Sequence, residues 1–467
     1  MKRRSKRQPS RPIPIRAVTK SEAAGYWGVV EGFYGRPWTA DQRKELCSWM
    51  ADAGLTSYFY TPKDDPKHRA LWPQLYTASE RSWMEPLIRS CDRRGIRFIY
   101  GLAPGLSQGM QAAEVERLLV RKVLSLQELG CRHFALLFDD IPAEGAKHYL
   151  QRYGSWAGAH IAWTHRVREA LLKRDPQARF LFCPTPYCEA FSGPIGESAY
   201  LHQLGRELSS DVEIFWTGKD IVSRTIKPGE MRELSTVIGR PPVIWDNLFA
   251  NDYDMRRLYL GPYAGRPQEL KSTVRGIFIN PNCEYRANFI PLRSFADYIR
   301  GGKNWSVERS YSQAQKAWRD QFIDLKGTLP TPAQMRLLCD SLHLPFHHGR
   351  VAARALDDAR ITLRSKGTRT TETGQRLRRW ATGMADWHTR MTELRDRDLT
   401  YTLYRHVWEL KEEGDLLLRY LSWLQDKTPG RKPFRSLFHQ PGTYRGGLAS
   451  DLQHCLKMKT SGEFQGV

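Results

Sequence analysis

The sequence predicts an α/β protein in which a (β/α)8 TIM barrel is followed by an all-α helical bundle. Eight short apolar segments recur between residues 28 and 282, and helical stretches separate most of them. Their near-continuous hydrophobicity is typical of parallel strands that are buried on both faces. After about residue 302 helical patterns dominate and no further strand is predicted. We therefore expect a basic disordered tail over 1–24, the barrel over 25–301 and a stalk-like helical domain over 302–467.

The predicted strands alternate with charge-flanked helical stretches. Strands are expected at residues 28–33, 57–61, 97–101, 133–138, 179–183, 213–216, 242–245 and 276–279. Helices are expected at residues 39–53, 81–94, 113–129, 157–173 and 228–238, and several end next to a glycine. Alternation alone also fits a doubly wound open sheet, but eight strands in about 260 residues favour a closed barrel.

The C-terminal region carries two clear helix signals. Thr331, Pro332 and Gln334 occupy the N-cap, N1 and N3 positions of a predicted helix start. Residues 401–425 place leucines and a valine along one stripe, as an amphipathic helix of a bundle does.

Composition limits the class of protein. No apolar run reaches the ~18 to 20 residues of a membrane span, and the basic start of the chain lacks the apolar stretch of a signal peptide. The net charge of +22 gathers in residues 1–20, at +8, and in residues 302–467, at +10, so the barrel is nearly neutral. We expect no specific nucleic-acid partner, no membrane partner and a cytoplasmic location.

Eight cysteines are scattered along the chain without a CxxC pair, which indicates free thiols in a reducing compartment. Zinc ligation is the alternative, and His343, His347 and His348 have suggestive spacing. Pro345 interrupts the helix that would align these histidines, so we interpret the segment as a loop. No metal or cofactor is expected.

Polar side chains gather where the predicted strands end. These positions are residues 31–35, 62–65, 139–140, 184–187, 217–218, 246–247 with 251–252, and 280–282. A single such residue would be read as a cap or a turn. Because the carboxyl ends of TIM-barrel strands build the active site, seven coincident polar ends predict a binding site at the barrel mouth.

Two adjacent carboxylates, Asp139 and Asp140, follow the fourth predicted strand. Neighbouring carboxylates repel each other when partly desolvated, so one takes a raised pKa and the pair supplies an acid and a base. Binding of Mg²⁺ or Mn²⁺ and a helix cap at Asp140 are the alternatives. Lys63 and the amide-rich strand ends favour a polyhydroxylated ligand over a cation.

Adjacency constrains how this pair could act on a glycosidic bond. Retaining glycosidases hold their nucleophile and acid ~5 Å apart, on different sides of the bond. Neighbouring side chains at one strand end do not easily flank a sugar in this way. They can do so if a 2-acetamido group of the substrate is the nucleophile, with one aspartate polarising its N–H and the other protonating the leaving oxygen.

Ten motifs in chain order resemble those of glycoside hydrolase family 84, the O-GlcNAcases. The barrel motifs are VVEGFYGRPW (29–38), PKDDPKHR (62–69), FALLFDDI (134–141), FCPTPYC (182–188), WTG (216–218), PVIWDNLFANDYD (242–254), LGPYAGR (260–266) and NPNCEYRAN (280–288). TPAQMRLLCDSLHLPFHHG (331–349) and TYRGGLASDLQ (443–453) resemble the stalk of the animal enzymes. The resemblance covers roughly residues 25–456, is strongest over the barrel, and implies that the barrel is the catalytic domain.

The resemblance implies roles for the matching residues. Asp139 resembles the residue that orients the 2-acetamido group, and Asp140 resembles the general acid and later base, with an oxazoline intermediate. The implied hydroxyl-binding groups are the Gly32 backbone, Lys63, Asn247, Asp252 and Asn280. The implied acetamido contacts are Tyr187 and Trp245, with Cys183, Thr217 and Ile221 lining the methyl pocket. Ile221 and Phe249 depart from the commonest family choices, which bears on the width of this pocket.

The resemblance implies a retaining exo-β-N-acetylglucosaminidase that releases O-linked N-acetylglucosamine from Ser or Thr of proteins. A hexosaminidase acting on free glycan or cell-wall fragments would use the same site, and a non-catalytic glycopeptide-binding platform is a third hypothesis. The expected partner is an O-GlcNAc-modified protein or another N-acetylglucosaminide. The helical domain is expected to form either a homodimer interface, as in the animal relatives, or an intramolecular bundle.

Overall fold

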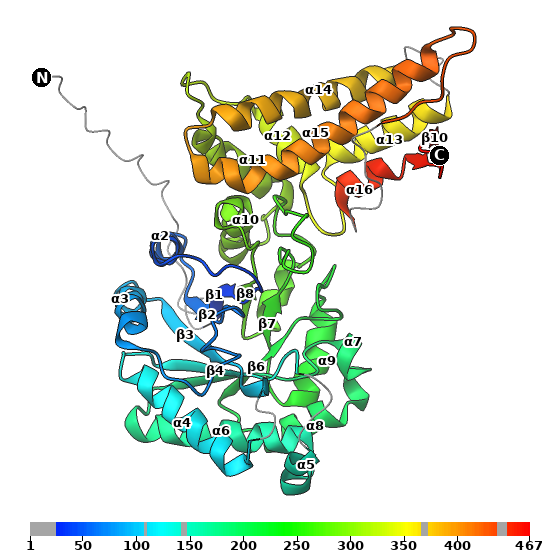
Figure 1. The fold of residues 1–467 in the computed structure, drawn as a ribbon. Helices are drawn as coiled ribbons and strands as arrows, with labels where there is room; N and C mark the ends of the chain where they lie inside the picture. The colour runs from blue at the N-terminus through cyan, green and yellow to red at the C-terminus, as the bar shows by residue number, and fades with distance from the viewer. Residues whose placement is uncertain (1–24, 107–109, 142–146, 366–371, 437–445) are drawn as a thin grey trace, which may run out of the picture.

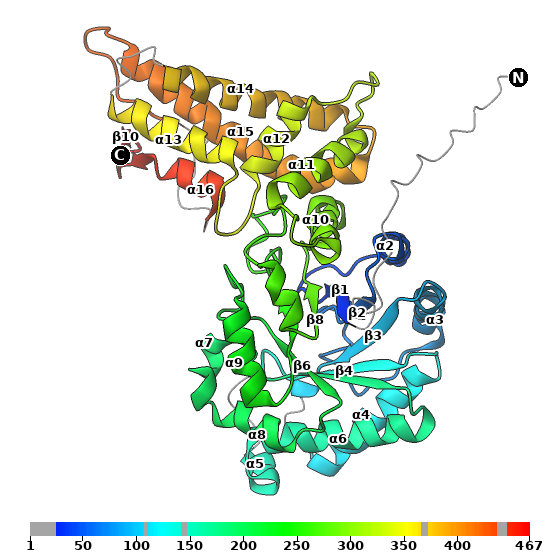
Figure 2. The same cartoon turned by 180° about the vertical axis from the view of Figure 1, so that it is seen from behind.

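The computed structural model describes residues 25–106, 110–141, 147–365, 372–436 and 446–467 (Figure 1). The predicted tail at 1–24 lies outside these residues. Figures 1 and 2 show a barrel surrounded by helices and a separate helical layer, with α10 between them. The barrel is closed, because β1 pairs in parallel with both β2 and β8. The prediction of a TIM barrel is confirmed, and the open sheet is excluded.

The eight barrel strands lie within two residues of their predicted bounds. They are β1 (Tyr26–Glu31), β2 (Ser57–Tyr60), β3 (Arg97–Leu102), β4 (His133–Leu137), β5 (Arg179–Cys183), β6 (Val212–Trp216), β7 (Val243–Asp246) and β8 (Gly276–Ile279). Nearly every strand residue is buried, which is why the apolar runs identified them.

Helices cover the outside of the barrel (Figure 1). They are α2 (Ala40–Asp52), α3 (Ala78–Arg93), α4 (Ala112–Gln127), α5 (Lys147–Tyr153), α6 (Trp156–Arg174), α7 (Glu189–Ser192), α8 (Ala199–Glu207), α9 (Pro228–Ile238) and α10 (Phe289–Arg300). Short 3-10 turns occur at Pro104–Leu106, Ile195–Glu197, Gln268–Ser272, Tyr285–Asn288 and Arg319–Phe322. Helix α3 begins three residues before the predicted start, because Thr77 and Glu80 form a capping box there.

The C-terminal region is helical apart from one small hairpin. Its helices are α11 (Val307–Trp318), α12 (Pro332–Ser341), α13 (Arg350–Arg364), α14 (Glu372–Glu393), α15 (Arg397–Gln425) and α16 (Gly447–Gln453). Thr331 and Gln334 form the predicted capping box of α12. Strands β9 (Leu456–Met458) and β10 (Phe464–Gly466) pair antiparallel, although no strand was predicted after residue 302. Three-residue strands are too short to show a periodic pattern, and Phe464 is instead fixed by packing on Phe434.

The barrel and the helical region share one apolar core at their junction. The core of the helical region takes in residues from the barrel loops and from α10, namely Leu258, Leu260, Ala287 and Ile290. Backbone amides of Leu260 and Gly261 donate to the carbonyls of Leu342 and His343 at 2.6 and 2.7 Å. These contacts attach the loop after β7 to the end of α12.

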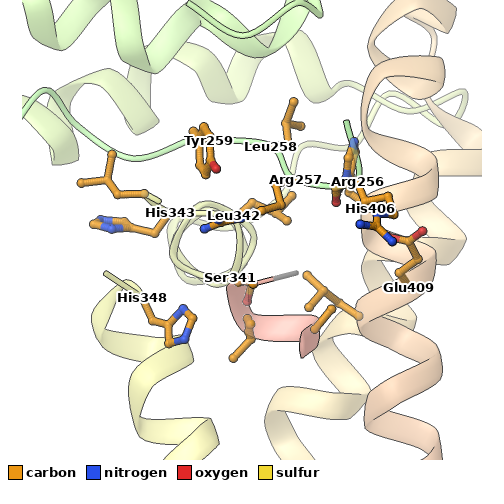
Figure 3. Close-up of a pocket in the computed structure, with 16 residues that line it drawn as sticks. Arg256, Arg257, Leu258, Tyr259, Ser341, Leu342, His343, His348, His406 and Glu409 are labelled. Atoms are coloured by element: carbon orange, nitrogen blue, oxygen red, sulfur yellow. Dashed lines mark hydrogen bonds between the residues drawn. The ribbon is translucent and has the colours of Figure 1, made fainter. Parts of the chain in front are cut away.

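A pocket lies beside this junction, between the loop after β7 and helices α12, α15 and α16 (Figure 3). On α15, the His406 Nδ1 donates to the Arg256 carbonyl at 3.1 Å, and burial lowers the pKa of this imidazole to about 4. Arg257 donates to the Pro345 carbonyl at 2.8 Å. Three histidines and two arginines share its lining with leucines, and Glu409 is the single carboxylate there, so this pocket lacks the acid pair that glycoside hydrolysis requires.

Three further expectations concern membrane spans, the cysteines and the histidine-rich segment. In the part of the chain that the structure describes, no helix is both long and apolar enough to cross a membrane. All eight cysteines are buried free thiols, as predicted. The segment with His343, His347 and His348 lies between α12 and α13, which confirms the predicted loop.

Candidate active site

A pocket at the carboxyl ends of the barrel strands brings together all twelve residues that the sequence singled out. Its cavity has a volume of about 280 Å³, at the small end of ligand pockets, which suits a single sugar residue. The predicted residues that line it are Gly32, Lys63, Asp139, Asp140, Cys183, Tyr187, Thr217, Ile221, Trp245, Asn247, Asp252 and Asn280. They come from seven different strand ends, which only a closed barrel places around one hollow.

Asp139 lies deep in the pocket and is held by one cation. Its Oδ2 forms an ion pair with the Lys63 ammonium, and both side chains are almost completely buried. Burial opposes ionisation, but the charge of Lys63 outweighs it and lowers the pKa of Asp139 below its usual value. The buried Oδ1 of Asp139 has no hydrogen-bond partner among the described residues. Asp139 is therefore a carboxylate with one acceptor left for a ligand N–H or O–H.

Asp140 lies at the mouth, and its side chain points to different partners. The hydroxyls of Tyr34 and Tyr187 donate to its Oδ2 and Oδ1, both at 3.0 Å. Its φ of 50° is left-handed, the only such value among the described non-glycine residues. Asp140 lies in a turn, and its left-handed backbone differs from the extended backbone that a helix N-cap adopts, so the structure does not support the alternative role as a helix cap. Adjacent aspartates thus occupy one buried and one exposed position.

Amide and carboxylate groups form a second wall of the pocket. The Asn280 Nδ2 donates to the Asn247 Oδ1 at 2.9 Å, and the Asn247 Nδ2 donates to the Ile221 carbonyl at 2.8 Å. The Asn280 Oδ1 is buried without a partner among the described residues. Burial raises the pKa of Asp252, whose Oδ2 accepts from the Tyr34 amide at 2.9 Å. Two unpaired buried acceptors in one pocket, on Asp139 and Asn280, indicate a polar ligand.

The remaining wall is apolar and closely packed. Trp245 packs edge-on against Phe59 and Phe215 of the barrel core, with ring centroids at 5.5 and 5.7 Å. A Cβ on Gly32 would lie 2.3 Å from the Trp245 ring, so only glycine fits there. Burial raises the pKa of the Cys183 thiol, which therefore contributes a neutral surface. The wall can hold a small apolar group such as a methyl.

Four other residues line the pocket although the sequence assigned them no role: Tyr34, Val222, Ala250 and Tyr253. Tyr34 could have been found, because it follows the first predicted strand directly and lies within a motif of the resemblance. Val222 and Ala250 are small apolar loop residues that carry no local signal of their own.

The geometry agrees with comparisons to known proteins. The family model described as beta-N-acetylglucosaminidase matches residues 27–333, which is most of the chain. The chain belongs to the β-N-acetylglucosaminidase family. The Protein O-GlcNAcases of Rattus norvegicus and Mus musculus are each 41% identical to it over 278 residues. The match covers 59% of this chain but only 30% of each of those proteins.

A solved structure supports the same membership. A mutant of the Thermobaculum terrenum O-GlcNAc hydrolase is 26% identical and superposes with a TM-score of 0.75. The likeness covers 85% of this chain and 83% of that chain, so it extends into the helical region.

In this member of the family, a buried ion pair joins the end of β7 to the loop after β6. Arg266 donates to both oxygens of Asp246, at 2.7 and 2.6 Å, and both side chains are fully buried. The Tyr263 hydroxyl donates to the same carboxylate at 2.7 Å. Arg266 also donates to the carbonyls of Ser223 and Arg224, in the loop after β6. One guanidinium therefore ties the end of β7 to the loop after β6.

We expect Arg266→Met to lower the free energy of unfolding by about 3 to 5 kcal/mol, because it leaves the Asp246 carboxylate buried and unpaired. Chemical denaturation followed by circular dichroism measures this loss. Arg89→Met is the matched control, since Arg89 is 66% exposed in its pair with Glu85 and its loss should cost less than about 1 kcal/mol. Equal effects of the two substitutions would contradict the assigned role.

A buried lysine on α4 supports the loop after β2. The Lys122 ammonium donates to the Gln74 carbonyl and lies 4.2 Å from the Tyr76 ring centroid. The Tyr76 hydroxyl donates at 2.6 Å to Asp65, two residues after Lys63. Lys122 is completely buried. It therefore lies beneath the loop that presents Lys63 to the pocket.

Burial lowers the pKa of Lys122 from 10.5 to about 7, so stability should depend on pH through this residue. Below about pH 7 the folded and the unfolded chain both carry the proton. Between about pH 7 and 10.5 the unfolded chain binds more protons, so the free energy of unfolding rises with pH. We expect the free energy of unfolding, measured by urea titration, to rise more for wild type than for Lys122→Met between about pH 6.5 and 9. Lys44→Met, at an exposed position of α2, should show no such trend.

Proposed function

We propose that the chain is a retaining exo-β-N-acetylglucosaminidase that removes O-linked N-acetylglucosamine from Ser or Thr of proteins by substrate-assisted catalysis. One observation carries the proposal: adjacent aspartates present one buried carboxylate with a free acceptor and one exposed carboxyl group held by two hydroxyls. The buried group suits an acetamide N–H, and the exposed group suits the leaving oxygen. Membership of the β-N-acetylglucosaminidase family supports the same assignment.

In the first step, the acetamide carbonyl oxygen of the substrate attacks the anomeric carbon while the bond to the aglycone oxygen breaks. Asp139 accepts the acetamide N–H and stabilises the positive charge that develops on the closing oxazoline ring. Asp140 transfers its proton to the leaving oxygen, so the Ser or Thr hydroxyl departs neutral. The carboxylate of Asp139 is available at once, because Lys63 keeps it ionised.

In the second step, Asp140 acts as a base and takes a proton from water as the water attacks the anomeric carbon. The oxazoline C–O bond breaks, and the electron pair returns to the acetamide oxygen. Two displacements at one carbon retain the anomeric configuration. Asp140 ends the cycle protonated and ready for the next substrate.

The remaining pocket residues hold the sugar in this scheme. The Gly32 backbone, Lys63, Asn247, Asp252 and Asn280 bind the hydroxyls, and the free Oδ1 of Asn280 accepts one of them. Tyr187 and Trp245 contact the acetamido group. Its methyl group lies against Cys183, Thr217 and Ile221.

A glycoprotein substrate can be separated from a free glycan by kinetics. We expect kcat/KM to be higher for an O-GlcNAc glycopeptide than for a chito-oligosaccharide, because Tyr34, Ile221 and Tyr253 expose apolar surface at the pocket mouth. The Asp139→Asn variant is the control for contaminating activity. A preference for the chito-oligosaccharide would instead support the hexosaminidase hypothesis.

We further propose that two copies associate through α15. Tyr401, Tyr404 and Trp408 lie three and four residues apart on one face of this helix and are 73%, 38% and 45% exposed. Light scattering over a range of concentrations should give a dimer that Tyr401→Ser with Trp408→Ser converts to a monomer. A wild-type chain that stays monomeric at every concentration would favour the intramolecular bundle.

We also propose a cytoplasmic location for the enzyme. Eight buried free thiols are compatible with a reducing compartment. Fractionation of the host cell, with detection of the protein by antibody, tests this location.

A further inference from the structure

We propose that Arg69 is a positioning residue that holds Asp140 in the conformation required of the acid. The proposal rests on the function proposed above and adds a residue to its machinery. Arg69 lies in the loop after β2, between Tyr34 and the backbone of Asp140. It does not line the sugar pocket, so its effect would reach the reaction only through these two neighbours.

The backbone of Asp140 needs an external support. A left-handed φ of 50° brings the Cβ of a residue close to its own carbonyl, which costs free energy, although aspartate tolerates this conformation better than most residues. Such a conformation persists only where the surroundings hold it in place. The Arg69 Nη2 donates to the carbonyl oxygen of Asp140 at 3.1 Å. This hydrogen bond is made to the backbone of Asp140 itself.

The same guanidinium also fixes one of the two hydroxyls on the Asp140 carboxyl group. Its Nη1 donates to the Tyr34 hydroxyl, and its Cζ lies 5.3 Å from the Tyr34 ring centroid. The Tyr34 hydroxyl then donates to the Asp140 Oδ2 at 3.0 Å. Burial raises the pKa of Tyr34, so this hydroxyl keeps its proton and remains a donor.

Arg69 therefore holds Asp140 at two points, the peptide carbonyl and, through Tyr34, the carboxyl group. A planar guanidinium can reach both acceptors at once, whereas the ammonium of a lysine is a single point charge. The Tyr187 hydroxyl bonds the other carboxyl oxygen from the opposite side of the mouth. Without Arg69, the backbone of Asp140 can relax from its left-handed conformation. This change moves the Asp140 carboxyl group away from the leaving oxygen. The buried Asp139 is held by Lys63 instead and should keep its role.

The test compares aryl β-N-acetylglucosaminides whose phenol leaving groups range from acidic to weakly acidic. We expect Arg69→Met to reduce kcat/KM on the order of 10²-fold for the poorest leaving group, since a misplaced acid costs about that much. The most activated glycoside needs little protonation and should lose only a few-fold. The dependence of rate on leaving-group pKa should therefore steepen. Arg69→Lys should steepen it as well.

Two further variants keep the test independent of folding. Tyr34→Phe removes only the hydroxyl link and should steepen the same dependence to a smaller extent. Arg93→Met, at an exposed position of α3, should leave the dependence as in wild type. Loss of folded protein would lower the rate equally for all glycosides. Thermal unfolding of each variant shows whether such a loss occurs at the assay temperature.

An unchanged dependence in Arg69→Met, with the wild type active, would overturn the role of Arg69 and leave the proposed function intact. An equal loss on all glycosides would also overturn it. A wild-type chain that hydrolyses none of the glycosides would overturn the proposed function together with this inference.

Discussion

Asp139→Asn should lower kcat/KM by about 10²- to 10³-fold on activated and poor leaving groups alike, as removal of one oriented charge-stabilising group does elsewhere. In the proposed mechanism Asp139 acts on the acetamide, and oxazoline closure is needed whatever the leaving group. An asparagine keeps the shape of the side chain but cannot balance the positive charge of the closing ring. Steady-state kinetics on a pair of aryl β-N-acetylglucosaminides, one activated and one not, measures the effect.

The substitution also leaves the Lys63 ammonium buried without its counter-charge. Thermal unfolding must therefore show that the variant is folded at the assay temperature. Asp52→Asn, at the exposed end of α2, is the matched control and should keep wild-type rates. A loss confined to the poor leaving group would contradict the role given to Asp139 and would assign it to the acid instead.

Asp140→Asn should instead give a loss that depends on the leaving group. We expect kcat/KM to fall by about 10²- to 10⁴-fold for an alkyl or other poor leaving group, the usual contribution of a general acid. An acidic phenol departs without a proton, so its glycoside should lose about tenfold or less in the first step. Small anions such as azide, which attack the oxazoline without help from a base, should raise the turnover of the activated substrate.

The Asp139→Asn and Asp140→Asn variants are assayed on the same two substrates, so each variant serves as a control for the other. The Asp140 carboxyl group lies at the exposed mouth, so its neutralisation should not destabilise the fold as loss of a buried charge would. Equal losses on both substrates, or no azide effect, would contradict the division of labour between the two aspartates.

The barrel could be predicted because its signals are local. Every strand is buried on both faces, so an apolar run of four to six residues identifies it without knowledge of its neighbours. The site followed from topology, since parallel strands in a closed barrel must end at one mouth. Asp139, Asn247 and Asn280 come from three separate strand ends and line one pocket for this reason.

The directions in which the pocket side chains point could not be predicted in the same way. Asp139 and Asp140 point to different partners because the backbone at Asp140 turns left-handed. Aspartate tolerates this conformation better than most residues but adopts it only occasionally, so its identity alone does not predict the turn. The contacts of Arg69 with Tyr34 and Asp140 join residues 35 and 71 positions apart. The C-terminal hairpin and the core shared by the barrel and the helical region likewise depend on tertiary packing.

Substitution of fluorine in the acetamide of an aryl β-N-acetylglucosaminide tests substrate-assisted catalysis most directly. Fluorine withdraws electron density from the carbonyl oxygen that attacks the anomeric carbon, while the leaving group stays the same. We expect kcat/KM of the wild-type enzyme to fall steeply with each fluorine added, from acetyl to trifluoroacetyl. A rate that does not change across this series would show that the acetamide is not the nucleophile and would contradict the mechanism assigned to Asp139 and Asp140.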